Sequence, residues 1–195
     1  MSSSFFNREA ASQAVEALLC ALGFDPAVTP HLQQTPQRVA AAWIDDLLNG
    51  YSVDVVQLLQ RESITTSLSS SADLVVLRDV DTTIICPHHL MPALGTATVA
   101  YVPSTRLVGL GALARLVDAF AHRLTLQEDV GRNVVDSLQG ALETQGAFCR
   151  LRLRHSCLCA RGERKQGWVE TVSALGCLAP GGTYATMSPL LYSAS

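Results

Sequence analysis

The chain has 195 residues and a formal net charge of −3, so it is long enough for one domain with a real hydrophobic core. The slight acidic balance argues against a nucleic-acid-binding surface, which normally shows as a basic surplus. No apolar run reaches the length of a membrane span, and the first residues lack the pattern of a secretory signal. We therefore expect a cytoplasmic protein whose six cysteines stay reduced and favour metal binding over disulfides.

Helical spacing and capping signals dominate the first part of the chain. One helix is predicted over 8–23, closed by a glycine cap. A second helix begins at Thr35-Pro36, with threonine as N-cap and proline in the first turn, and runs to Gly50. A loop rich in serine and threonine follows at 63–72. The remaining pattern predicts strands at 73–85 and 95–102, helices at 109–122 and 127–142, and strands at 147–159 and 168–176.

The order of two strands, two helices and two strands predicts an α+β fold. Such an order favours an antiparallel sheet with both helices on one face. We expect an N-terminal helical region at 1–62, a catalytic region at 73–176 and an irregular tail at 177–195, within one domain overall.

Two short segments carry the residue types of a metal site. Cys86-Pro87-His88-His89 has a proline that cannot donate to a sheet ladder, so Cys86 is expected to end a strand and lie on a turn with His89. Strand alternation places His155 and Cys157 on one face of a later strand. Either segment alone is weak evidence, since a buried free cysteine often serves as a small hydrophobe. If the segments meet, they suggest a zinc site with a fourth position open to water, which is the catalytic kind.

These segments belong to a longer pattern, which runs in unbroken order over roughly residues 12–176 and resembles GTP cyclohydrolase I. Other matching segments are Thr35-Pro36-Gln37-Arg38, Leu113-Ala114-Arg115, Gln127-Glu128 and Arg161-Gly162. The resemblance implies the tunnelling fold, in which sheets from several subunits join into a barrel. It therefore implies a homo-oligomer, as one ring of subunits or two stacked rings, with active sites between subunits.

The resemblance also implies roles for single residues. The family's zinc ligands fall on Cys86, His89 and Cys157, and its proton-transferring histidines fall on His88 and His155. Its purine-reading pair falls on Gln127 and Glu128, where a carboxylate can accept two hydrogen bonds from guanine. Judged from the residues alone, the first turn of a helix is the favoured interpretation of this pair, because glutamate there complements the helix dipole.

The triphosphate site of the family is only partly matched. Arg38, Arg115 and Arg161 correspond to three of its arginines. However, a family lysine falls on Ala41, and a family serine and lysine fall on Gly111 and Ala112. Each lost charge-assisted hydrogen bond costs roughly 1.5–3 kcal/mol of binding free energy. Within the metal motif, Pro87 replaces a family glutamate that would tune the neighbouring histidines.

The pattern as a whole predicts a zinc-dependent cyclohydrolase that opens the imidazole ring, at the C8–N bonds, of a guanine-like purine. The missing phosphate contacts favour a base or nucleoside without the triphosphate as substrate. The main alternative is an orthodox GTP cyclohydrolase I, which makes 7,8-dihydroneopterin triphosphate from GTP. A non-catalytic tunnelling-fold binding protein is a further alternative. A zinc nucleobase deaminase is disfavoured, because the sequence has neither His-x-Glu nor Pro-Cys-x-x-Cys.

Overall fold

The computed structural model describes residues 5–65, 73–184 and 191, and its contacts divide the chain into two units, Met1–Asn49 and Gly50–Ser195. The division expected from the sequence, at residues 62, 73 and 177, stays a prediction. None of the described helices is both long enough and apolar enough to cross a membrane.

The N-terminal unit is helical. Helix α1 (Arg8–Ala21) is capped by Asn7, whose side chain accepts a hydrogen bond from the Ala10 amide. After η1 (Pro30–Leu32), helix α2 (Thr35–Ala41) packs against α1. The predicted continuous helix to Gly50 is wrong, because the chain changes to a π-helical segment, η2 (Ala42–Leu47), and then to η3 (Asn49–Ser52).

A four-stranded antiparallel sheet organises the second unit, with the strand order β2-β3-β5-β6. Its strands are β2 (Val75–Cys86), β3 (Met91–Val102), β5 (Gly146–His155) and β6 (Val169–Gly176). The unpredicted helix α3 (Val55–Arg61) precedes a small two-stranded sheet of β1 (Ser63–Thr65) and β4 (Arg106–Val108). The predicted loop at 63–72 is therefore a strand in its first three residues, and its remainder lies outside the described residues.

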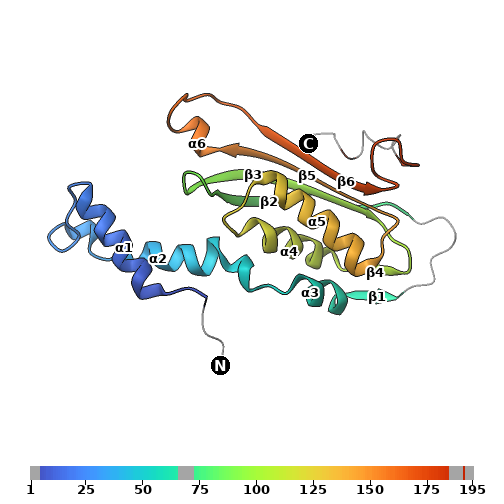
Figure 1. Cartoon of the computed structure of the whole chain (residues 1–195), viewed down its shortest axis with the longest axis horizontal. Helices are drawn as coiled ribbons and strands as arrows, with labels where there is room; N and C mark the ends of the chain where they lie inside the picture. Colours follow the sequence, from blue (N-terminus) through green and yellow to red (C-terminus); the bar gives the residue numbers. More distant parts are fainter. Residues whose placement is uncertain (1–4, 66–72, 185–190, 192–195) are drawn as a thin grey trace. The chain divides into compact units, whose positions relative to one another are not determined.

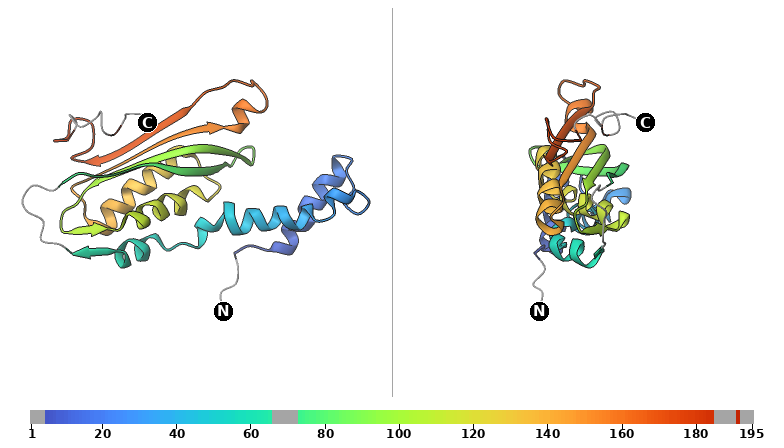
Figure 2. Two further views of the ribbon diagram at one scale, coloured as in Figure 1. Left: turned by 180° about the vertical axis from the view of Figure 1, so that it is seen from behind. Right: turned by 90° about the vertical axis from the view of Figure 1, so that its right-hand side faces the viewer.

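Two helices, α4 (Leu110–Ala121) and α5 (Gln127–Leu142), cover one face of this sheet, as Figure 1 and Figure 2 show. The main core lies between the helices and the sheet. It includes Leu113, Leu116, Val134 and Leu138 from the helices and Ala97, Val99, Leu151 and Leu153 from the strands. The α+β class, with an antiparallel sheet and both helices on one face, is confirmed.

The end of β5 differs from the sequence prediction. The strand ends at His155, which pairs with Ala93, and residues 156–159 turn into the short helix α6 (Ser156–Cys159) instead of continuing the strand to 159. Cys157 is therefore placed by a helical turn and not by strand alternation. At the other end of the sheet, Leu178 and Leu191 pack against Phe148 on the face opposite the helices, which we call the outer face.

Candidate metal centre

A tight turn at the end of β2 carries both histidines of the first motif. The turn closes when the Leu90 amide donates to the Cys86 carbonyl at 2.9 Å. Leu90 adopts a left-handed φ of 53°, which lets the chain reverse directly into β3. The Cys86 Sγ atom then lies 3.8 Å from His88 Nδ1 and 3.7 Å from His89 Nδ1. Pro87 thus starts a turn that brings one thiol and two imidazoles together, as the sequence predicted.

The second motif meets this turn across β3, which lies between β2 and β5 in the sheet. The ligand atoms of Cys86, His89 and Cys157 all lie within 4.8 Å of one another. Two tetrahedral zinc ligands, one sulfur and one nitrogen, stand about 3.6 Å apart at ordinary bond lengths. The 3.7 Å separation of Cys86 Sγ and His89 Nδ1 fits that geometry. Two thiols and one imidazole are a donor set that suits zinc and leave one coordination position open.

The Cys157 thiol lies in an unfavourable place for a lone negative charge. Burial raises the pKa of Cys157, and the neighbouring Cys86 raises it further, whereas the positive charge of Arg161 lowers it. Thiols bind a metal ion as thiolates, so a cation bound here would displace both protons and offset the repulsion between the two thiolates. The pair is therefore compatible with a metal site.

His155 lies beside the ligand group at the end of β5. Its Nε2 atom is 2.8 Å from the Oε1 atom of Gln127. Burial lowers the pKa of His155, and the charge of Glu128 opposes that effect. An imidazole held mostly neutral beside a metal site can accept and return a proton, which is what a general acid–base catalyst requires.

A hollow of about 260 Å³ opens onto these groups. It is smaller than the roughly 300–1,000 Å³ of typical small-molecule sites, so one chain encloses only part of a nucleotide-sized ligand. Its walls come from the β2 turn, the start of α5 and the end of β5. The lining residues are Ile84, Cys86, Pro87, His88, His89, Thr125, Leu126, Gln127, Glu128, His155, Cys157 and Val169.

Gln127 and Glu128, the predicted purine-reading pair, are neighbours with opposite environments. Glu128 is exposed at the hollow, whereas Gln127 is only 2% exposed. The Gln127 amide nitrogen donates to the carbonyls of Leu151 at 3.2 Å and Val169 at 3.0 Å. Both residues stand in the first turn of α5, which was the alternative considered from the sequence.

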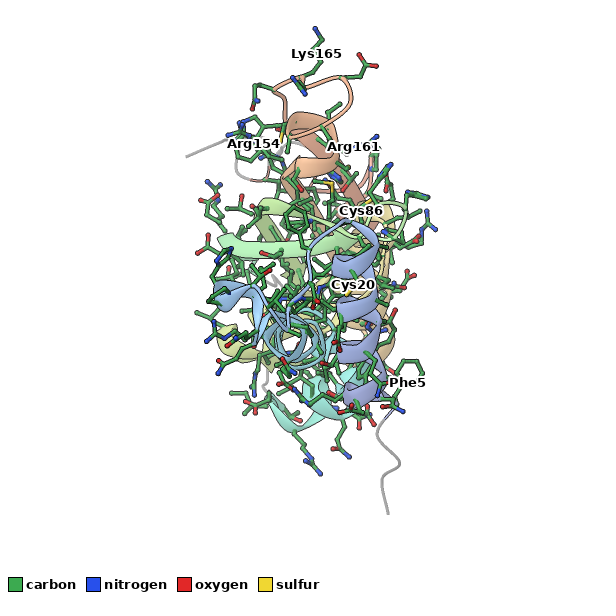
Figure 3. All side chains as sticks on the ribbon, turned by 90° about the vertical axis from the view of Figure 1, so that its left-hand side faces the viewer. Phe5, Cys20, Cys86, Arg154, Arg161 and Lys165 are labelled. Atoms are coloured by element: carbon green, nitrogen blue, oxygen red, sulfur yellow. The ribbon has the colours of Figure 1, made fainter. Side chains whose placement is uncertain are left out.

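The three arginines expected to bind phosphates have different surroundings. Arg38 lies on α2 in the N-terminal unit, where it donates to Gln34 at 2.7 Å. Arg115 on α4 forms an ion pair with Glu62, with 3.1 Å between Nη2 and Oε1. Arg161 follows α6 and acts electrostatically on Cys157; Figure 3 shows Lys165 at the outer tip of the same loop and Arg161 nearer to Cys86.

The start of α4 holds the two positions where the family has a serine and a lysine. Ala112 is buried in the main core, whereas a side chain at Gly111 would meet no atom within 4 Å. A hydroxyl group would therefore fit at position 111 without rearrangement.

Sequence reasoning missed some residues that shape this site. Glu62 was not singled out, although it pairs with Arg115, because an ion pair between distant segments leaves no periodic signal. Thr125 and Leu126 line the hollow because Leu124 forms a bridge to Ile85 at the end of β2. Thr125 and Leu126 belong to the family-like segment 123–128, but no role was inferred for them, because spacing patterns give no information between two helices.

Residues 11–180 match the sequence model of the family described as GTP cyclohydrolase I. The GTP cyclohydrolase 1 of Chlorobium phaeovibrioides is 36% identical over 167 residues, covering 86% of this chain and 73% of its own. That of Allorhizobium ampelinum is 38% identical over 161 residues, covering 83% and 78%. A crystal structure of an archaeosine synthase QueF-Like in the apo form aligns with a TM-score of 0.43 and 18% identity, over 55% of this chain and 97% of its own.

Proposed function

Because the chain belongs to the GTP cyclohydrolase I family, we propose that it is a zinc-dependent hydrolase that opens the imidazole ring of GTP. The observation that carries this proposal is the convergence of Cys86, His89 and Cys157 within 4.8 Å of one another. His88, His155 and Glu128 line the same hollow, so acid–base groups and a base-binding carboxylate stand beside the ligand set.

The proposed reaction assigns each group a step. A zinc ion held by Cys86, His89 and Cys157 would supply Lewis-acid activation of water for attack on C8 of the purine. Glu128 accepts hydrogen bonds from the ring N–H and the exocyclic amine of guanine, and so sets the register of the base. His155 and His88 transfer protons to the ring nitrogens as the C8–N bonds break.

GTP is the proposed substrate because the curated relatives at 36–38% identity are GTP cyclohydrolase 1 proteins. A substrate without the triphosphate remains the second candidate. It is favoured by one specific observation, the lack of cationic or hydroxyl side chains at Ala41, Gly111 and Ala112. The paired state of Arg115 with Glu62 points the same way.

One experiment separates the two candidates. Zinc-loaded protein is incubated with GTP, guanosine or guanine, and products are identified by mass and by pterin fluorescence. We expect GTP to give 7,8-dihydroneopterin triphosphate, and chelator-treated protein to give nothing. Ring-opened guanosine with unchanged GTP would replace the first candidate by the second. Failure of all three purines in the zinc-loaded protein would contradict a cyclohydrolase and favour a binding protein.

We also propose that the active form is a ring of several copies of this chain. Strands β2 and β6 stand at the two edges of the described sheet, each with one neighbouring strand in it. Pairing of such edges between copies removes exposed backbone hydrogen-bonding groups and closes the sheet. Light scattering on the purified protein tests this directly, and a fully active monomer would contradict it.

A further inference from the structure

Gln127 is an uncharged polar side chain at a buried position. It is the first residue of α5 and reaches between two neighbouring strands, donating to Leu151 of β5 and Val169 of β6. An amide group has two N–H hydrogens, and the two carbonyls use both. No amide hydrogen therefore remains to bind a purine. Purine recognition was the role that the family resemblance implied for this residue.

The same contacts decide which way the amide faces. Amide oxygen and nitrogen can be exchanged in a structure unless the hydrogen-bond partners distinguish them. Backbone carbonyls only accept hydrogen bonds, so the nitrogen of Gln127 must face Leu151 and Val169. The Oε1 atom then necessarily faces His155 Nε2, at 2.8 Å.

The amide oxygen in turn decides where His155 holds its hydrogen. An amide oxygen only accepts, so a hydrogen bond of 2.8 Å requires that Nε2 of His155 carry the hydrogen. In a neutral imidazole the other nitrogen, Nδ1, then bears the free lone pair. The neighbouring Glu128 is exposed at the hollow and is free to bind the base, whereas Gln127 contacts His155.

We infer that Gln127 is a positioning residue, which holds His155 in its Nε2–H form and leaves Nδ1 as the proton-accepting atom. The inference rests on the proposed function for its catalytic meaning, because His155 is the proposed acid–base group. The hydrogen-bond arrangement itself does not depend on the substrate.

Nitrogen NMR spectroscopy tests the inference without any need for turnover. The imidazole nitrogens of zinc-loaded, ¹⁵N-labelled protein are recorded in long-range proton–nitrogen spectra, and His155 is identified by its loss in His155→Ala. We expect the shift pattern of a single tautomer with hydrogen on Nε2. A wild-type pattern with hydrogen on Nδ1 would overturn the inference, whether or not the protein proves active on GTP.

Two variants separate positioning from base recognition. Gln127→Met keeps the length of the side chain but removes its polar atoms, so we expect a mixed His155 tautomer. The value of kcat should fall by roughly 10–100-fold, part of the 10²–10⁴-fold that a positioned acid–base group contributes, with little change in KM. In Gln127→Glu we expect the buried acid to stay protonated, because an ionised carboxylate would face the carbonyls of Leu151 and Val169 without a hydrogen to donate. Its hydroxyl can then donate to one carbonyl while its other oxygen accepts from His155, which should restore the Nε2–H form. A raised KM with the wild-type tautomer in Gln127→Met would assign Gln127 to the base instead.

Discussion

Arg115 and Glu62 form an ion pair, with 3.1 Å between Nη2 and Oε1, at the place where the family resemblance puts a phosphate-binding arginine. Both side chains are about half exposed, and such a pair contributes only about 0–1 kcal/mol. A triphosphate can therefore compete for Arg115, but it must first displace a carboxylate.

Removing that competition should improve GTP binding. We expect Glu62→Gln to lower KM for GTP by up to about fivefold without changing kcat, because the pair is worth at most about 1 kcal/mol. Steady-state kinetics measure the change, and Glu16→Gln on α1 controls for the change in net charge. A raised KM in Glu62→Gln would contradict this competition, and an unchanged KM in Arg115→Ala would show that Arg115 does not contact the phosphates.

Loss of one thiol should release the metal. We expect the unaltered chain to carry about one zinc ion and Cys157→Ala to carry none, because a site with three protein ligands seldom survives removal of a thiolate. Metal analysis by mass spectrometry measures the ratio. Cys159→Ala is the matched control, since this cysteine lies two residues further along α6 and is not part of the ligand group. Stoichiometric zinc in Cys157→Ala would refute the ligand assignment.

Loss of the proposed acid–base group should spare the metal. We expect His155→Ala to keep its zinc and to lose turnover by roughly 10²–10⁴-fold. Activity and metal content are measured on the same preparation. Loss of zinc from His155→Ala would mean that His155 is a metal ligand. The roles of His155 and His89 would then have to be exchanged.

Two glycines of the second unit, Gly95 and Gly111, should respond in opposite ways to the same substitution. A Cβ atom at Gly95 in β3 would run into the Arg152 carbonyl and lie 3.0 Å from Leu153 Cα, and backbone atoms cannot move aside cheaply. We expect Gly95→Ala to lower the free energy of unfolding by about 1–3 kcal/mol. At Gly111, in the first turn of α4, an added Cβ atom would lie in open space. We expect Gly111→Ala to raise the free energy of unfolding by up to about 1 kcal/mol. Urea denaturation compares the two, and equal effects would contradict the packing at Gly95.

The buried thiol of Cys149 should make the free energy of unfolding fall as the pH rises into the alkaline range. Full burial raises the pKa of this thiol to about 12, whereas an unfolded cysteine titrates near 8.5. The folded chain therefore keeps the proton longer than the unfolded chain, and the unfolded chain gains stability as pH rises above about 9. We expect the stability advantage of wild type over Cys149→Ala to shrink between about pH 8 and pH 10.5. A constant difference would show that the thiol is accessible to solvent.

The sequence indicated which candidate ligands belong together but not how the backbone presents them. The family resemblance assigned the ligand role to Cys86, His89 and Cys157, whose ligand atoms lie within 4.8 Å of one another in the structure. Residue type alone indicated thiols and imidazoles suited to zinc but left open which histidine would be a ligand. The reason offered for Cys157 was wrong, since the chain leaves the strand at His155 and α6 supplies the cysteine. The alternation that placed Leu153, His155 and Cys157 on one face continues through residues 153–157, so the pattern itself carries no sign of the turn.

The environment of Gln127 shows a different limit. A glutamine in the first turn of a helix is normally exposed, and nothing local predicts its burial. Its partners, Leu151 and Val169, lie on two strands that follow it in the chain by 24 and 42 positions. Hydrogen bonds to backbone carbonyls can be made to any residue type, so they leave no trace in the sequence of the partner strands.

The packing of Leu178 and Leu191 against Phe148 affects which part of the outer face is prone to aggregation. Figure 1 shows residues 177–184 at the end of the sheet opposite α6, so this end of the outer face is shielded. At the other end Leu94 and Trp168 are about half exposed. Phe148 and Arg154, the partner of Leu94, are six residues apart on β5, which is about 20 Å. We therefore expect aggregation during purification to begin at the end of the sheet that carries the candidate metal ligands. Such aggregation should also lower the enzyme activity.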